Sequence, residues 1–148
     1  MKKIIFSMLI LTSLMSFSCC KSAKNKKVDN NLPLLETQWN LVAIDGKEIS
    51  NEFAIRPFIV FDSTGAIHGS LGCNSFFGNY TLLKKQKMTL EYSGATKRLC
   101  GKMEVEKQYM KALKQDITNY EIAGENLFLF SGKDEVLKFT GVDLTTVE

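Results

Sequence analysis

From residue 35 to the end of the chain, short apolar runs alternate with residues that favour turns. Asp-Gly, Ser-Thr-Gly, Gly-Glu and Ser-Gly sequences separate runs that are rich in Val, Ile, Leu, Phe and Tyr. Runs of this kind between turn signals predict β-strands. A long succession of short strands favours an antiparallel meander that closes into a small β-barrel. The expected strands cover residues 39–44, 58–61, 66–71, 80–83, 88–92, 120–123, 127–130 and 136–140.

One segment, residues 102–117, departs from the strand pattern and predicts a helix. Glu104 and Glu106 lie near its start and lysines follow later, an order that suits the helix dipole. We therefore predict a mainly β fold of the α+β class with one helix, whose apolar stripe packs on the core. The apolar residues recur at helical spacing, at Val105, Tyr109, Ala112, Leu113 and Ile117.

The first residues of the chain have the features of a secretory signal peptide. Lys2 and Lys3 precede fourteen uncharged and mostly apolar residues, 4–17. Spanning a bilayer takes about 20 apolar residues. The run therefore predicts a signal peptide over residues 1–18 rather than a transmembrane anchor.

The segment from Met15 to Cys19 resembles a bacterial lipobox, in which small or apolar residues precede a cysteine that receives a lipid. Ser16 stands where a leucine is usual, and Cys20 is the rival acceptor, with Cys19 where a small residue is expected. We predict Cys19 as the lipidated residue and the membrane as a partner through it. An ordinary secreted protein is the alternative.

The segment that follows Cys19 is polar and has no apolar period. We predict a flexible tether over residues 19–34 and a single folded domain over residues 35–148. No acidic residue directly follows Cys19, which favours an outer-membrane lipoprotein that faces the periplasm. Exposure at the cell surface is the alternative.

Composition and charge exclude several classes of protein. The 148 residues are 45% hydrophobic and 24% charged, as in an ordinary globular chain. Six of the 19 basic residues precede residue 31, whereas 15 of the 16 acidic residues follow it, so residues 31–148 carry 13 − 15 = −2. A slightly acidic domain without a basic stripe argues against nucleic-acid binding.

The sequence contains little that would support catalysis. His68 is the single histidine, and it lies in an expected strand, where a surface or half-buried position is the simpler interpretation. The sequence contains no Gly-x-Ser-x-Gly, Walker or dinucleotide-binding motif, and too few clustered ligands for a metal site. We therefore predict no enzyme activity, no catalytic residue, no metal and no cofactor.

Cys73 and Cys100 form the second pair of cysteines. If the chain is exported, both reach an oxidising compartment, where two cysteines of a small domain usually pair. Closing a loop of about 28 residues would contribute about 3–4 kcal/mol to stability. We predict a structural disulfide; two buried free thiols and a redox-active pair are the alternatives.

Several motifs together resemble the META/HslJ family of small bacterial envelope lipoproteins. The region that resembles the family extends over about residues 35–141. Trp39 lies near its start, and Thr96 and Cys100 follow its central motif. The central motif is Gly69-x-x-Gly72-Cys73-Asn74-x-Phe76-x-Gly78-x-Tyr80.

The resemblance implies a lipocalin-like antiparallel barrel with one helix. The three glycines of the motif would then allow tight bends or close backbone approach. Asn74 is expected to bond to backbone in a turn, with a buried binding residue as the alternative. Phe76 and Phe77 would point to opposite faces, so that one is buried and the other exposed.

Members of the family are linked to stress without an agreed ligand or reaction, which leaves three hypotheses. The first is a non-enzymatic, lipid-anchored envelope protein that acts by binding or by protecting the envelope under stress. The second is an inhibitor of a secreted protease, with candidate loops at Ser50–Pro57 and Ser93–Lys97. The third is a carrier of a small apolar ligand inside the barrel.

Overall fold

The computed structural model describes residues 30–50, 52–101 and 103–142. The predicted signal peptide over residues 1–18, the lipidation of Cys19, its rival Cys20 and most of the predicted tether lie outside the described residues. Within the described ranges, no helix is both long enough and apolar enough to cross a membrane.

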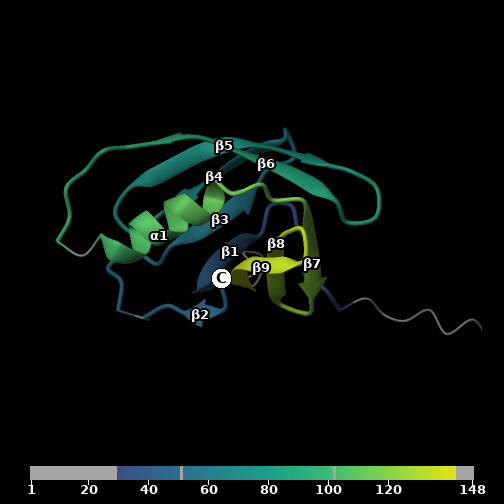
Figure 1. Ribbon diagram of the computed structural model, residues 1–148, viewed down its shortest axis with the longest axis horizontal. Helices are drawn as coiled ribbons and strands as arrows, with labels where there is room; N and C mark the ends of the chain where they lie inside the picture. The colour runs from purple at the N-terminus through teal and green to yellow at the C-terminus, as the bar shows by residue number, and fades with distance from the viewer. Residues whose placement is uncertain (1–29, 51, 102, 143–148) are drawn as a thin grey trace, which may run out of the picture.

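Across the described residues, nine strands and one helix follow one another in an order close to the one that the sequence predicts (Figure 1). The elements are β1 (Gln38–Ile44), β2 (Lys47–Glu48), β3 (Phe58–Phe61), β4 (Ala66–Ser70), β5 (Ser75–Leu82), β6 (Met88–Ala95), α1 (Glu104–Leu113), β7 (Asn119–Ala123), β8 (Asn126–Ser131) and β9 (Asp134–Val142).

The strands form one antiparallel sheet that curls into a half-barrel, which confirms the predicted fold class. Its order is β6-β5-β4-β3-β1-β9-β8-β7, with β2 paired to β1. The first long strand and the last strand are therefore neighbours, and the meander is open between β6 and β7. These two edges meet at one end, where the Met88 N–H donates to the Thr118 carbonyl (3.1 Å) and the Tyr120 N–H to the Gln86 carbonyl (3.0 Å).

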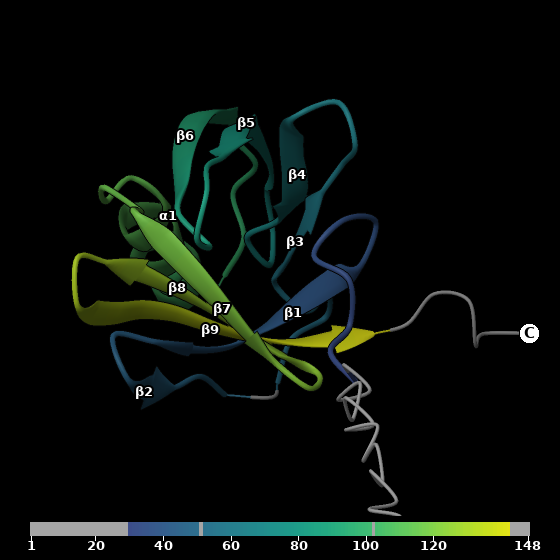
Figure 2. The ribbon, with the colours of Figure 1, turned by 90° about the vertical axis from the view of Figure 1, so that its right-hand side faces the viewer.

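Helix α1 connects the two open edges and covers the space between them. It contacts β6 and β1, and Figure 2 shows it between β6 and β8. Its buried face carries Tyr109, Ala112 and Leu113, as the helical spacing predicts. The helix therefore completes the wall that the sheet leaves open.

Large side chains fill the interior of the half-barrel. Tyr109 packs edge-on against Phe76 (5.8 Å between ring centroids) and Phe139 (6.1 Å), so helix and sheet share one core. A filled interior agrees with the bulky composition of the strands. The largest fully buried side chains are Trp39, Tyr109, Phe61, Phe76 and Phe139.

The structure differs from the expected boundaries at the start of the fold, in β5 and β6, and in the helix, where α1 ends at Leu113 rather than at residue 117. The fold begins before residue 35, because Leu34 is buried in the core and its carbonyl accepts the indole N–H of Trp39 (3.0 Å). Strand β5 begins at Ser75 rather than at residue 80, and β6 continues to Ala95. Both extensions arise because β5 and β6 pair along their whole length, which holds turn-forming residues in strand geometry.

Candidate functional site

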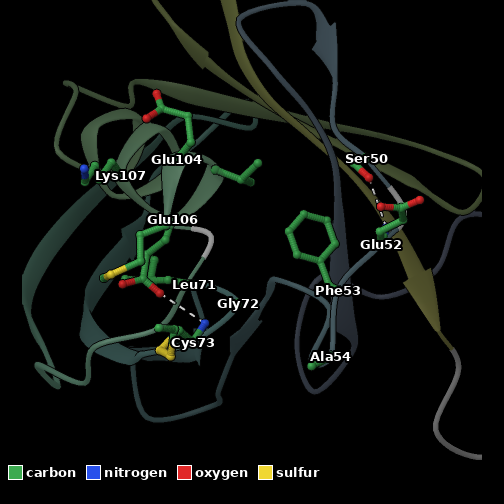
Figure 3. A pocket seen from close by; sticks show the side chains of 14 residues that line it. Ser50, Glu52, Phe53, Ala54, Leu71, Gly72, Cys73, Glu104, Glu106 and Lys107 are labelled. Carbon is green, nitrogen blue, oxygen red and sulfur yellow. Dashed lines mark hydrogen bonds between the residues drawn. A yellow bond between two sulfur atoms is a disulfide. The ribbon is translucent and has the colours of Figure 1, made fainter.

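A cleft of about 850 Å³ lies at one end of the half-barrel, beside the start of α1. Three connections surround it: the loop from β2 to β3, the β4–β5 turn at residues 71–74 and the segment between β6 and α1. Its lining includes Phe53, Leu71, Cys73 and Glu106 (Figure 3). Val105 also lines it. Apolar side chains and a few charged groups therefore share one concave surface.

The β2–β3 loop forms one wall of the cleft and is fixed to the sheet at both ends. The Ile49 N–H donates to the Val42 carbonyl (2.9 Å), and the Leu41 N–H donates to the Pro57 carbonyl (2.9 Å). In Figure 3, Phe53 projects from this wall toward the β4–β5 turn. The wall thus has anchored ends and exposed residues between them.

Glu106, in the first turn of α1, is a buried carboxylate that holds the helix to the β4–β5 turn. Only 5% of its surface is exposed. Its Oε2 accepts the backbone N–H groups of Cys73 (3.1 Å) and Asn74 (2.9 Å), and its Oε1 accepts the Asn74 side-chain amide (2.6 Å). Burial, and to a lesser extent this carboxylate, raises the pKa of nearby Tyr92.

Asn74 extends the same network to the segment between β6 and α1. It is 3% exposed. Its amide also donates to the Arg98 carbonyl (3.1 Å), and its Oδ1 accepts the Arg98 N–H (2.6 Å) and the Thr96 hydroxyl (2.8 Å). Asn74 therefore bonds to backbone, as expected, and is also a buried residue that joins three segments.

A disulfide between Cys73 and Cys100 joins the same two segments covalently. The Cα atoms are 6.3 Å apart, and the two cysteines are 27 positions apart in the chain. Both residues line the cleft, and Cys100 is exposed. The cleft is thus held by a covalent link and a hydrogen-bond network acting on the same turn.

The glycines of the motif permit close contact between backbones. A Cβ on Gly69 would overlap the Phe58 carbonyl oxygen, and one on Gly78 would overlap the Glu91 carbonyl oxygen. Gly72, in the turn beside the cleft, has a backbone φ of +116°, which residues with a side chain rarely adopt.

The remaining signature residues support the fold. Trp39 is fully buried, and the Tyr80 hydroxyl donates to the Asp62 carbonyl (2.6 Å). Phe76 is buried and Phe77 is 59% exposed, so the expected alternation is confirmed. The exposed Phe77 lies on a strand, beside Gly94, rather than on a loop.

Of the two candidate loops, only Ser50–Pro57 is a loop along the part that the structure describes. The prediction of a loop at Ser93–Lys97 is wrong for its first three residues. Ser93 to Ala95 belong to β6, because Phe77 pairs with Gly94 and Phe76 with Ala95. Thr96 and Lys97 follow the strand. The first loop borders the cleft.

Glu106 is the site residue that the sequence prediction missed, because it was interpreted only as an acid that suits the helix dipole. A signal was present: Glu106, Tyr109 and Leu113 are spaced three and four residues apart on the buried face of α1. An acid on such a face needs partners, which here come from a turn more than thirty residues away. The described residues contain no group of three metal-binding side chains.

Comparisons with known proteins agree with this fold. The sequence matches the META domain family over residues 32–143. An NMR structure of a protein from Burkholderia xenovorans is 24% identical, with a TM-score of 0.54 over 74% of this chain and 83% of the other. A second NMR structure is 22% identical, with a TM-score of 0.51 over 70% of this chain and 87% of the other. No curated protein matches the sequence.

Proposed function

Because the chain belongs to the META domain family, we propose that it is a non-enzymatic, lipid-anchored protein of the cell envelope that binds another envelope component through the cleft. Lipidation at Cys19 would hold the domain at the membrane, and the polar tether would leave the cleft free to reach a partner. Binding at this site would be its contribution to protecting the envelope under stress.

The observation that carries this proposal is the cleft itself. Concave surfaces lined by apolar side chains and a few polar groups are the usual binding sites of small domains. The disulfide and the Glu106–Asn74 network hold the walls beside α1, and backbone hydrogen bonds to β1 hold the ends of the β2–β3 loop. A preorganised site loses little conformational entropy when a partner binds.

The test is a capture experiment with a cleft variant and a matched surface variant. Ala54 lines the cleft and Ala123 lies on β7; both are exposed. The tagged full chain, Ala54→Arg and Ala123→Arg are incubated with the organism's envelope and secreted fractions. We expect a near-stoichiometric envelope protein that wild type and Ala123→Arg retain and Ala54→Arg loses. Equal capture by all three proteins would exclude the cleft as the binding site of the partner.

Inhibition of a secreted protease is the second candidate, and the Ser50–Pro57 loop favours it. An inhibitory loop needs exposed residues between fixed ends, and here Ile55 is 53% exposed while the flanking Ile49 and Pro57 are hydrogen-bonded to β1. In the same capture experiment, a secreted protease bound by the intact chain would support this candidate. Cleavage of the loop by that protease would count against it.

A further inference from the structure

We infer that the cleft binds a protein segment in which an apolar side chain is flanked by lysine or arginine. This inference rests on the proposed function, because it names the chemistry of the partner for the same site. It follows from three features of the cleft: its apolar surface, the sign of its charge and the positions of its acidic side chains.

Exposed apolar side chains lie on two of the connections that form the cleft. Ile55 follows the lining residue Ala54 and is 53% exposed, and Leu99 precedes the lining residue Cys100 and is 97% exposed. Phe53 and Val105 are half-buried in the lining. Large apolar groups left in water beside a concave site indicate a surface that a partner covers.

The charged side chains of the cleft are mostly acidic. Of the lining residues that the structure describes, Glu52, Glu104 and Glu106 are acidic and Lys107 is basic. The start of α1 also carries a positive partial charge, but the carboxylates of Glu104 and Glu106 lie in that same turn and offset it. The surface therefore complements a cationic partner better than an anionic one.

The two exposed acids lie on opposite walls of the cleft. Glu52 belongs to the β2–β3 loop and Glu104 to the first turn of α1, and Figure 3 shows them on either side of the space that Phe53 enters. An apolar side chain seated between these walls would bring its neighbours in the chain close to the two carboxylates. This arrangement matches a segment with a base on each side of an apolar residue.

The test measures the affinity of defined peptides for the full chain in a non-ionic detergent. The probe is a fluorescent, end-capped peptide with the core Lys-Leu-Phe-Lys; the matched peptides carry Glu-Leu-Phe-Glu and Lys-Ser-Ser-Lys. We expect the first peptide to bind, and each of the others to bind at least about tenfold more weakly, since both the charge and the apolar anchor contribute. Equal binding of all three peptides would overturn the inference.

Charge reversal on the protein assigns the binding to the cleft. The variant Glu52→Lys/Glu104→Lys should weaken binding of the Lys-Leu-Phe-Lys peptide about tenfold, because both acids are exposed and each contributes modestly. Glu91→Lys/Glu121→Lys, at exposed positions on β6 and β7, is the matched control and should bind like wild type. Equal losses in both variants would place the peptide elsewhere and contradict the inference.

The two proposals can fail separately. If no peptide binds while the capture experiment still returns a partner that Ala54→Arg loses, the partner chemistry is wrong and the binding function stands. If the peptide binds at the cleft but no envelope protein is captured, the function is wrong and the specificity of the cleft is correct.

Discussion

Glu106 and Tyr109 lie one turn apart on the buried face of α1, and their polar atoms have opposite environments. The Glu106 carboxylate accepts three hydrogen bonds from the β4–β5 turn. The Tyr109 hydroxyl is fully buried and has no hydrogen-bond partner among the residues that the structure describes. A partnered buried group holds elements together, whereas an unpartnered one costs stability. The two residues should therefore respond to substitution in opposite directions.

Replacing Glu106 by glutamine should lower the free energy of unfolding by about 2–3 kcal/mol, since charge-assisted hydrogen bonds would be lost and an amide N–H would face donors. Urea denaturation measures the change. Glu104→Gln, in the same turn but exposed, is the control and should change stability by less than about 0.5 kcal/mol. Similar values for the two variants would contradict the role given to Glu106.

Replacing Tyr109 by phenylalanine should raise the free energy of unfolding by about 1 kcal/mol, because it removes a buried hydroxyl that lacks a partner. Burial raises the pKa of Tyr109 well above its usual value near 10.0. The folded state then binds more protons than the unfolded state above about pH 10, so stability falls as the pH rises further. Tyr109→Phe should reduce this alkaline loss, as measured by urea denaturation from pH 7 to 11; a destabilised variant would contradict the account.

At the scale of elements, local patterns predict the strands and the helix but not every boundary. Short apolar runs predict β1 and β3, and buried positions alternate along most of both strands because each strand buries one face. The start of β5 contains Ser75 and follows Gly72 and Asn74, residues that favour turns, and only pairing with β4 and β6 makes it a strand. The position of Glu106 depends in the same way on how α1 docks. Long-range contacts therefore set the parts that the sequence does not predict.

The disulfide joins two of these elements, the β4–β5 turn and the segment before α1. The Cys73→Ser/Cys100→Ser variant should lose about 3–4 kcal/mol of stability, because the cross-link reduces the entropy of the unfolded chain. Treating the wild type with a reductant should produce a similar loss, and thermal denaturation measures both. Two free thiols in the untreated wild type, found by alkylation and mass measurement, would contradict the bridge.

At the scale of the whole molecule, the cleft lies at one end of the half-barrel, and the predicted lipid anchor comes before the folded domain in the sequence. The sequence predicts the fold class and the Cys73–Cys100 pair, but it does not predict the cleft. The cleft arises where three connections and the start of α1 meet, and these are far apart in the sequence. A binding role at the membrane therefore depends on two parts of the chain that can be tested independently.

If Cys19 is lipidated, the full chain should be found in the membrane fraction. Wild type and Cys20→Ser should remain with the membrane fraction and incorporate a labelled fatty acid, because acyl chains on Cys19 would anchor the chain. Cys19→Ser should do neither. Fractionation with immunoblotting and metabolic labelling measure both properties. Unchanged labelling of Cys19→Ser, together with loss of labelling in Cys20→Ser, would show that Cys20 and not Cys19 is the lipidated residue.

Photo-crosslinking in intact cells tests the central claim, that the cleft binds an envelope partner, most directly. A photoreactive benzoyl-phenylalanine replaces Ala54 in the cleft in one strain and Ala123 on β7 in another. The account predicts a single major crosslinked envelope protein at position 54 that is absent at position 123. The same pattern at both positions, or no crosslinked protein at position 54, would contradict it.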